Sequence, residues 1–409
     1  MFYNLSENVY LVKGACKSCI YDFNGAELYS VNDKLAHLID EVNSGKVFSD
    51  CPTGYDEETV SALHELEQCH ILTQNDIHIY RDISELKKDN ALVTMAWIEV
   101  TTKCNLRCIH CYNESDYHCD AFMAQEDYRL VIDNLAQMHV KKLQLIGGEP
   151  FIDRRALRYM LDYTVGKFSG IEVFTNGTLI TEDWYRYLSE NNIRVALSVY
   201  SYDSEIHDFV TKSKGSWAKT NDTICRLKEH GIKYRVCNIL MKDVDLGEKN
   251  TDNYELSNER DIVRMTGRAG LSLLTDELIK KRLITKESFS APIKRSFSSR
   301  LVSGHNCFDS KLYIAANLDV FPCVMERRIK HCNIKQSGKI VLDKSIQTLN
   351  KDRIQGCDCC EYRYACFDCR PNSLTENAYE KPWYCTYEPR TATWRDADTF
   401  IAELRKGRA

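Results

Sequence analysis

Three cysteines stand close together in the stretch 103–112, which reads Lys-Cys-Asn-Leu-Arg-Cys-Ile-His-Cys-Tyr. Cys104, Cys108 and Cys111 are separated by three and then two residues, just after an apolar run that predicts a strand. Thiolates at this spacing can bind one corner of a metal cluster, and a cubane cluster normally takes four cysteines. Three local ligands leave one iron open, and an open position gives a metal site room for a substrate. The alternative is a zinc site closed by a fourth Cys or His, and His110 lies between two of the ligands.

The whole chain is rich in cysteine: it contains nineteen, and nine of them fall between Cys307 and Cys385. Disulfides persist in oxidising compartments and are rare in the cytosol. The first thirty residues carry charged side chains throughout, which argues against a secretory signal. A clustered set of cysteines in a chain that is not secreted indicates metal ligation.

Composition argues against two classes of partner. The net charge is −5 over 409 residues, without a basic half or a long cationic run, so a nucleic-acid partner is not expected. No apolar stretch approaches the length that a membrane helix needs, so a membrane partner is not expected either. The length allows two or three domains that each bury a core. We therefore expect a cytoplasmic protein.

Residues 1–90 predict a small separate domain. Asn24-Gly25 lies between short β-prone runs, which is a strong hairpin signal. Asn32 is placed to cap a helix, and a second helix is expected over residues 57–69. A short strand near residues 77–80 would close the unit. A hairpin, two helices and a closing strand suggest a winged-helix type of domain.

From residue 91 onward, strand-like runs alternate with amphipathic helical patterns, which predicts a parallel sheet built from βαβ units. Five units are legible, fewer than in a complete eightfold barrel. A doubly wound open sheet is the alternative, and periodicity does not separate the two. Residues 246–268 show no legible sixth strand, and residues 271–283 read as a helix. The expected strands cover residues 92–100, 142–146, 171–174, 193–199 and 234–240.

The second predicted strand is followed by Gly147-Gly148-Glu149-Pro150. Paired glycines allow a ligand to approach the backbone, and Glu149 can accept a hydrogen bond from an amine, although a simple connecting turn is the better explanation of this motif taken by itself. Together with the three-cysteine loop, this motif resembles the signature of the radical S-adenosylmethionine (SAM) superfamily, over about residues 92–300. The resemblance implies a [4Fe–4S] cluster on the three cysteines, with SAM on the open iron. It also implies the SAM contacts: Gly147, Gly148 and Glu149 at the methionine amino group, His110 beside the adenine where Tyr or Phe is commoner, Ser198 at the ribose, and Asn176 nearby.

The C-terminal cysteines resemble a second pattern, the SPASM extension of radical SAM enzymes, over roughly residues 305–390. That extension binds two auxiliary [4Fe–4S] clusters in its family. This chain departs from the pattern at Leu318, where glycine is usual, and in the two-residue gap before Cys369. The resemblance assigns Cys307, Cys323 and Cys369 to the first auxiliary cluster, and Cys357, Cys360, Cys366 and Cys385 to the second. Cys332, Cys359 or an open iron could complete the first set, and two structural zinc sites are the alternative.

These observations predict an α/β protein of three domains: a winged-helix-like domain (1–90), a partial (β/α)6 radical SAM barrel (91–300) and a cysteine-rich SPASM domain (301–409). The first resembles the element with which peptide-modifying enzymes bind a leader peptide, by adding a strand to a sheet edge.

The resemblance implies an enzyme that reductively cleaves SAM and abstracts hydrogen from a ribosomally made precursor peptide. It would install a thioether, C–C or ether crosslink, with electrons from a flavodoxin or ferredoxin. The rivals are a formylglycine-generating sulfatase maturase and a non-catalytic zinc-stabilised binding protein. No residue is assigned to proton transfer.

Overall fold

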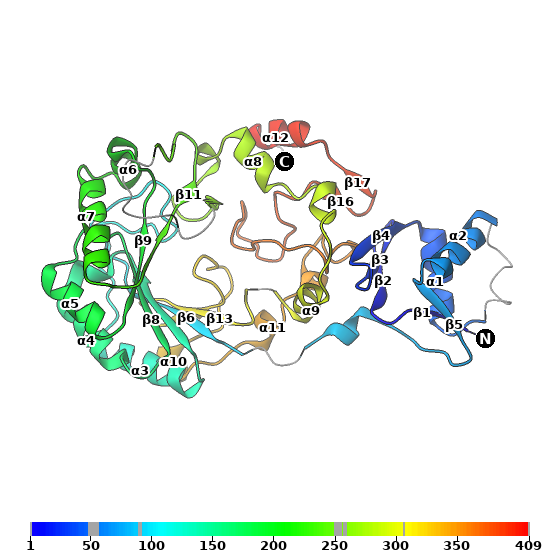
Figure 1. Ribbon diagram of the computed structural model, residues 1–409, viewed down its shortest axis with the longest axis horizontal. Helices are drawn as coiled ribbons and strands as arrows, with labels where there is room; N and C mark the ends of the chain where they lie inside the picture. Colours follow the sequence, from blue (N-terminus) through cyan, green and yellow to red (C-terminus); the bar gives the residue numbers. More distant parts are fainter. Residues whose placement is uncertain are drawn as a thin grey trace.

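The computed structural model describes residues 2–47, 57–88, 92–248, 256, 260–305 and 307–407. The predicted domain boundary at residues 90 and 91 lies outside the described residues. The N-terminal unit lies at one end of an elongated molecule and the helix-covered sheet at the other, with the cysteine-rich segment between them (Figure 1). None of the described helices is long and apolar enough to cross a membrane.

The strands are β1 (Phe2–Leu5), β2 (Val9–Lys13), β3 (Ser18–Asp22), β4 (Glu27–Val31), β5 (Leu72–Asn75), β6 (Met95–Thr101), β7 (Lys142–Gly147), β8 (Gly170–Thr175), β9 (Arg194–Ser198), β10 (Tyr234–Cys237), β11 (Ile239–Leu240), β12 (Asp261–Ile262), β13 (Lys311–Ile314), β14 (Asp319–Phe321), β15 (Cys332–Asn333), β16 (Tyr387–Glu388) and β17 (Thr393–Trp394). The helices are α1 (Asp33–Asn43), α2 (Glu57–Gln68), α3 (Gln125–Gln137), α4 (Arg154–Thr164), α5 (Glu182–Glu190), α6 (Ser204–Thr211), α7 (Ser216–Glu229), α8 (Asp276–Arg282), α9 (Arg295–Ser303), α10 (Ile334–Ser337), α11 (Lys344–Gln347) and α12 (Ala397–Arg405).

The N-terminal unit contains a three-stranded antiparallel sheet in the order β2-β3-β4. The predicted hairpin at Asn24-Gly25 is confirmed, because Asp22 pairs with Glu27 across it. The predicted helix cap is also confirmed, since the Asn32 side chain accepts a hydrogen bond from the Leu35 N–H at 2.8 Å. One face of the sheet shares a core with α1 and α2, and the other packs against the C-terminal segment and α9.

The predicted closing strand at residues 77–80 is wrong. The closing strand is β5, which ends at Asn75 and pairs antiparallel with β1. Beyond it, the main chain binds the Asn4 side chain instead of a strand: Asn4 Nδ2 donates to the Ile77 carbonyl at 3.1 Å, and the Ile79 N–H donates to Asn4 Oδ1 at 2.7 Å. A side-chain amide therefore satisfies main-chain groups that the prediction gave to a ladder.

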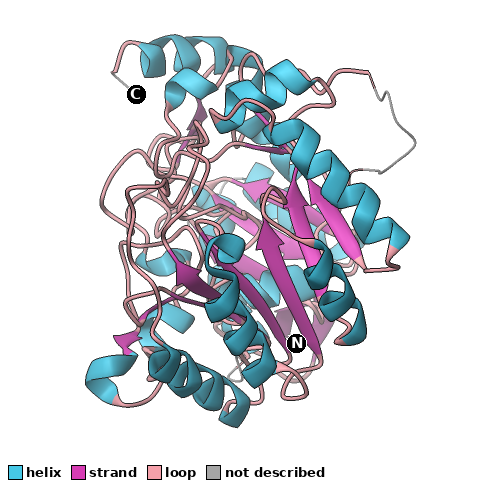
Figure 2. Ribbon diagram, turned by 90° about the vertical axis from the view of Figure 1, so that its left-hand side faces the viewer, coloured by secondary structure: helices cyan, strands magenta, loops and turns pink. Residues whose placement is uncertain are grey.

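The central sheet has eight strands in the order β10-β9-β8-β7-β6-β13-β14-β15, with every pair from β10 to β13 parallel. Figure 2 shows helices covering its outer side. Strands β6 to β10 are neighbours in sequence order, which is how a barrel is wound, whereas a doubly wound sheet reverses its order at a switch point. The α/β prediction with a mostly parallel sheet is confirmed.

A sixth barrel strand lies in the stretch that gave no legible signal. The short strand β12 pairs parallel with β11, which continues β10 after a break at Asn238. Two residues are too few to show a hydrophobic period, so this strand is identified only by its pairing with β11 in the structure. The helix expected at residues 271–283 is shorter than predicted: α8 begins after Thr275, whose hydroxyl accepts a hydrogen bond from the Leu278 N–H.

The C-terminal segment joins the barrel sheet directly. Strand β13 follows the predicted boundary at residue 300 and pairs with β6, and Leu312 and Ile314 enter the main core. Leu318 adopts a left-handed φ of 70° between β13 and β14, at the position where the family has glycine. The last helix, α12, packs on α8 beside the barrel mouth.

Candidate active site

The three-cysteine loop leaves the C-terminal end of β6 and is bound in place by Arg268. Its guanidinium donates to the Cys108 carbonyl at 2.9 Å and to the Ser115 carbonyl at 2.7 Å. The Arg268 N–H donates to the Cys111 carbonyl at 3.1 Å. Three carbonyls of one loop are thus satisfied by a residue more than 150 positions away in sequence, which sequence reasoning missed.

Cys104, Cys108 and Cys111 line one cavity of about 240 Å³. Its wall includes a residue at or just after the C-terminal end of each parallel strand from β6 to β10, together with β12. This is the face on which parallel barrels carry their active sites. Among the described residues, no three His, Cys, Asp or Glu side chains are arranged to hold a single metal ion.

Burial determines the protonation of the thiols. It raises the pKa of Cys108 to about 12 and that of Cys104 well above its usual value. Without a bound cation these sulfurs keep their protons, and metal binding must displace them. Cys104 Sγ accepts a hydrogen bond from the Leu106 N–H at 3.4 Å, a contact that favours the thiolate. The donor set, three sulfurs in a shielded cavity, suits an iron–sulfur cluster.

Gly147 ends β7 and Gly148 follows it, and both pack against the backbone where β6 passes into the cysteine loop. A Cβ on Gly147 would lie 2.2 Å from the Thr101 carbonyl oxygen, and a Cβ on Gly148 would lie 2.2 Å from that of Lys103. We expected these glycines to let a ligand approach. The structure shows a second reason for glycine here, because a side chain would keep the two loops apart. Their backbone forms part of the cavity wall.

Glu149 is fully buried, and its side chain does not line the cavity. Its carboxylate accepts hydrogen bonds from the Phe151 N–H at 3.0 Å, the Thr175 hydroxyl at 2.7 Å and the Asn176 N–H at 2.8 Å. Burial raises the pKa of Glu149 to about 7, and these hydrogen bonds act in the opposite direction. Glu149 thus connects the loops after β7 and β8, a role that differs from the implied contact with an amine.

His110 faces the cavity with its ring edge-on to Tyr200, at a centroid distance of 4.8 Å. Its Nδ1 is buried without a hydrogen-bond partner. Burial lowers the pKa of His110 to about 4, so the ring is neutral at physiological pH. A neutral flat ring with a free polar atom fits a heteroaromatic ligand, and it makes no contact that would close a zinc site.

Ser198 and Asn176 also line this cavity. Asn176 Nδ2 donates to Asn105 Oδ1 at 2.9 Å and so connects its turn to the cysteine loop. Tyr200, Asn238 and Arg264 line the same wall and were not identified from the sequence. Tyr200 follows a predicted strand, which was a usable signal. Asn238 lies inside another predicted strand, at the point where the observed strand breaks, and Arg264 lies in the stretch without a legible pattern.

The C-terminal cysteines form two groups. Cys357, Cys360, Cys366 and Cys385, the set assigned to the second auxiliary cluster, line one small cavity. Cys307 and Cys323 pack against another core cluster. Burial raises the pKa of Cys323 to about 11, and the nearby Cys369 also raises it.

Neither suggested fourth ligand joins the Cys307 group. Cys332 Sγ lies in β15, accepts a hydrogen bond from the Val341 N–H at 3.4 Å and packs against the barrel core. The main chain of Cys359 binds Ala15 of the N-terminal unit. What does approach this group is Arg264, whose Nε donates to Cys369 Sγ at 3.2 Å.

Residues 98–245 match the family model described as the radical SAM superfamily. These residues form a radical SAM domain. The matched range contains the three-cysteine loop, the Gly147-Gly148-Glu149-Pro150 motif and Ser198. The prediction of this superfamily, made from those motifs, is confirmed.

Two curated relatives come from Bacillus subtilis (strain 168). The antilisterial bacteriocin subtilosin biosynthesis protein AlbA is 38% identical over 143 residues, which is 34% of this chain and 32% of AlbA. The sporulation killing factor maturation protein SkfB is 27% identical over 183 residues, which is 44% of this chain and 42% of SkfB. The chain therefore spans between a third and a half of the length of these relatives.

Two solved structures share the fold over more than the radical SAM domain. Streptococcus suis SuiB aligns over 93% of this chain and 99% of its own, with a TM-score of 0.51 and 14% identity. The structure of anSMEcpe with bound AdoMet aligns over 76% of this chain and 95% of its own, with a TM-score of 0.50 and 16% identity. At these identities the likeness concerns the fold alone.

Proposed function

We propose that this chain is a radical SAM enzyme that reductively cleaves SAM, abstracts hydrogen from a ribosomally made precursor peptide and installs a crosslink. The observation that carries the proposal is the shared cavity, in which three thiols and the unpartnered Nδ1 of His110 meet at the C-terminal ends of the barrel strands. A [4Fe–4S] cluster on Cys104, Cys108 and Cys111 would supply the electron that cleaves a carbon–sulfur bond of SAM.

The residues of the chain bind and orient the cosubstrate. The neutral ring of His110 offers a flat surface and a polar atom to the adenine, while Ser198 and Asn176 offer a hydroxyl and an amide to the ribose. The backbone at Gly147 and Gly148 is open to the methionine end, and Glu149 keeps that loop in register with the next one. Enclosure by apolar residues such as Leu106 and Ile262 excludes water from the site.

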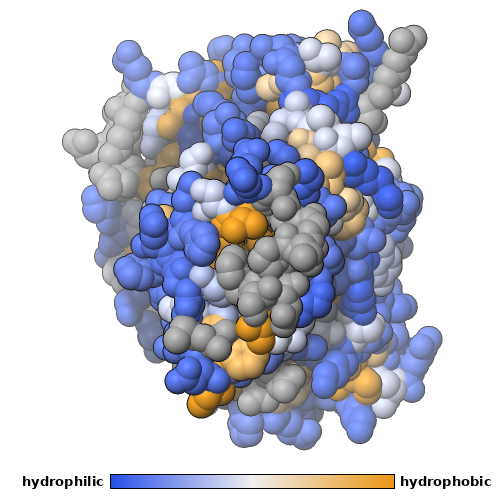
Figure 3. Space-filling view, turned by 90° about the vertical axis from the view of Figure 1, so that its right-hand side faces the viewer, coloured by the Kyte–Doolittle hydropathy of each residue, from blue (hydrophilic) through white to orange (hydrophobic). Residues whose placement is uncertain are grey.

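A peptide substrate is supported by two independent features. AlbA is named for bacteriocin biosynthesis and SkfB for maturation of a killing factor. In the N-terminal unit, β4 pairs with β3 on one side, and no strand within the described residues pairs with its other edge. A leader peptide can add a strand there through main-chain hydrogen bonds. The outward face of this unit is mostly hydrophilic, with small hydrophobic patches (Figure 3).

In this proposal the C-terminal domain carries two auxiliary clusters. Cys307, Cys323 and Cys369 bind the first, and Cys357, Cys360, Cys366 and Cys385 bind the second. An external flavodoxin or ferredoxin supplies the electrons. All cysteines in the described part of the chain are free thiols, which supports a reducing, cytoplasmic location. The three domains keep the division at residues 1–90, 91–300 and 301–409.

Anaerobic reconstitution with iron and sulfide tests the enzymatic part. With SAM and dithionite we expect 5′-deoxyadenosine, and roughly twelve iron atoms per chain if three cubanes form. Replacing Cys104, Cys108 and Cys111 together by Ala should abolish the product while leaving the auxiliary iron. A chain that binds zinc instead, and yields no 5′-deoxyadenosine, would contradict the proposal and support a non-catalytic binding protein.

Coexpression with a precursor encoded by a neighbouring gene tests the substrate class by mass spectrometry. A crosslink removes hydrogen mass from the peptide, whereas formylglycine formation would appear in a sulfatase instead. Deleting residues 1–85 should abolish binding of the precursor while 5′-deoxyadenosine formation without peptide persists. Undiminished peptide binding by that truncated chain would remove the role of β4.

A further inference from the structure

Among the described lysines, Lys351 is the one whose amine lies against a sulfur of the second auxiliary set. Its residue is only 6% exposed, and Nζ lies 3.0 Å from Cys366 Sγ and 2.9 Å from Asp368 Oδ1. Lysine is almost never buried unless it is paired, because burial strips the ammonium of water. Lys351 also lines the small cavity that the four thiols share.

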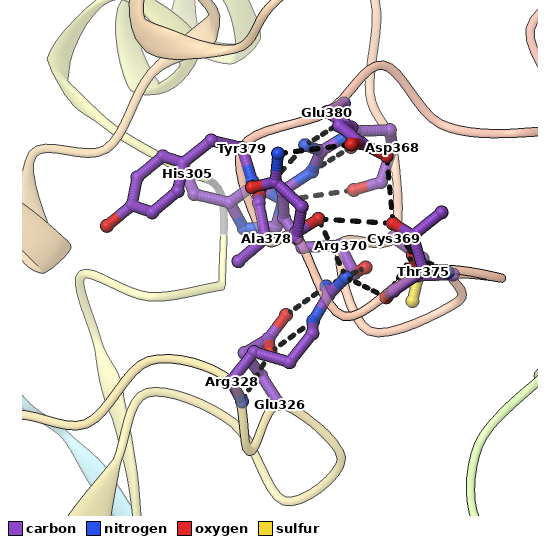
Figure 4. Close-up of polar contacts among 12 residues, drawn as sticks. His305, Glu326, Arg328, Asp368, Cys369, Arg370, Thr375, Ala378, Tyr379 and Glu380 are labelled. Atoms are coloured by element: carbon purple, nitrogen blue, oxygen red, sulfur yellow. Dashed lines mark hydrogen bonds and ion pairs between the residues drawn. The ribbon is translucent and has the colours of Figure 1, made fainter.

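Lys351, Asp368 and Arg370 together carry a net positive charge. Asp368 is bound on its other side by the buried guanidinium of Arg370, so two cations share one carboxylate. Arg370 is held in turn by the carbonyls of Ala378 and Glu380, and its own carbonyl accepts from Arg328 (Figure 4). His305 adds a ring nitrogen 3.0 Å from the Asp368 carbonyl, and burial keeps this ring neutral by lowering its pKa.

Other cations on the cavity wall have different partners. Arg363 donates to Asp352 and to the carbonyls of Lys13 and Cys360. The Lys381 amine binds the Tyr387 carbonyl and lies near Glu388. Of the described cationic side chains on this wall, Lys351 alone is in hydrogen-bond contact with one of the four sulfurs.

We propose that Lys351 is a positioning residue that raises the reduction potential of the cluster held by Cys357, Cys360, Cys366 and Cys385. This inference rests on the auxiliary cluster of the proposed function. Reduction adds one electron and one negative charge to a group that four thiolates already make anionic. A cation at hydrogen-bond distance in a buried site stabilises the reduced form more than the oxidised one.

The consequence concerns the path of electrons in the proposed reaction. Forming a crosslink after hydrogen abstraction leaves the substrate with one electron too many, and an acceptor must take it. Lys351 thus makes its cluster easier to reduce, and so a better final acceptor, than that cluster would be without the cation. Arg264 contacts Cys369 of the other set from the SAM cavity, and it shares the Asp261 carboxylate with Arg282.

The test is a redox titration of the reconstituted full chain followed by electron paramagnetic resonance. The background carries Cys104→Ala, Cys108→Ala and Cys111→Ala, so that only auxiliary signals remain. Lys351→Met removes the charge and the donor, Lys351→Gln retains a donor without the charge, and Lys351→Arg retains the charge. Lys330→Met, which removes an exposed lysine paired with Asp319 at 2.9 Å, is the matched control.

We expect one auxiliary signal to move to a lower potential in the Met and Gln variants and to stay in place in the Arg and control variants. A tenfold loss of reducibility corresponds to a shift of about 59 mV for a one-electron couple. Unchanged potentials in the Met and Gln variants would overturn the inference alone. If both neutral variants lose the iron of one cluster, Lys351 serves assembly and the inference is likewise overturned. A background chain without any auxiliary cluster would overturn that part of the proposed function as well.

Discussion

Replacing Gly148 by Ala tests whether the two glycines serve to bring loops together. The new Cβ would lie 2.2 Å from the Lys103 carbonyl oxygen and 2.6 Å from that of Thr102. Carbon and oxygen in contact normally stand about 3.3 Å apart, so the backbones must separate by roughly 1 Å. The obstacle is main chain, which cannot rotate away as a flexible side chain would.

The separation breaks two hydrogen bonds, from the Gly148 N–H to the Thr101 carbonyl and from the Glu149 N–H to the Lys103 carbonyl, both 2.8 Å long. Each bond contributes about 0.5–1.5 kcal/mol, and overpacking costs about 1–3 kcal/mol. Gly148→Ala should therefore lower the free energy of unfolding by about 2–6 kcal/mol. The displaced cysteine loop should weaken SAM binding at least tenfold, which corresponds to about 1.4 kcal/mol.

Anaerobic urea unfolding followed by circular dichroism measures the first quantity, and equilibrium dialysis of the reconstituted protein with labelled SAM measures the second. Gly170→Ala is the matched control, because its Cβ would meet only the Lys142 Cγ at an ordinary 3.5 Å. The control should stay within about 0.5 kcal/mol of the unsubstituted protein. A Gly148→Ala protein that is equally stable and binds SAM equally well would refute the packing argument.

Three further predictions follow from single side chains. Arg268→Met leaves the Cys108 and Ser115 carbonyls of the cysteine loop without their donor, each at a cost of about 1–3 kcal/mol. The iron retained after gel filtration should therefore fall, and full retention would show that Arg268 does not hold the loop in place. Leu318→Gly relieves about 1–2 kcal/mol of left-handed strain but loses about 1.5–3 kcal/mol of burial and adds chain entropy, so the melting temperature should fall modestly, and a rise would show that strain dominates. Burial raises the pKa of the Asp208 carboxyl, but hydrogen bonds from Trp217 and Gly215 outweigh it and hold the pKa below its usual range. Its stabilisation is therefore present above about pH 4 and lost as the pH falls through the lower folded value, and Asp208→Asn should flatten the acid limb of the unfolding free energy.

The cluster loop and the glycine motif could be predicted from the sequence because each consists of a few residues in one short segment. Ligand spacing in Cys104 to Cys111 is local, and so is the strand that precedes it. The N-terminal hairpin and the cap at Asn32 were readable for the same reason. The prediction failed at residues 77–80, where apolar residues alternate as in a strand but the partner is the Asn4 side chain from a distant strand.

The grouping of the C-terminal cysteines shows the limit more sharply. A family resemblance assigned Cys357, Cys360, Cys366 and Cys385 to one set, and the fold brings them to one cavity. Cys332 and Cys359 were open candidates because spacing alone does not say which way a thiol faces. The Cys332 thiol packs against the barrel core, and the Cys359 carbonyl accepts a hydrogen bond from the Ala15 N–H.

Residue types and short spacings alone therefore indicated the proposed cluster chemistry. Its three ligands, Cys104, Cys108 and Cys111, belong to one loop and need no distant partner. Packing determined everything that surrounds those ligands: the sixth strand β12, the clamp by Arg268 and the ammonium of Lys351 against Cys366. Each of these contacts joins segments whose separation in sequence carries no periodic signal. Their energies come from burial and from hydrogen bonds that exist only after the chain has folded.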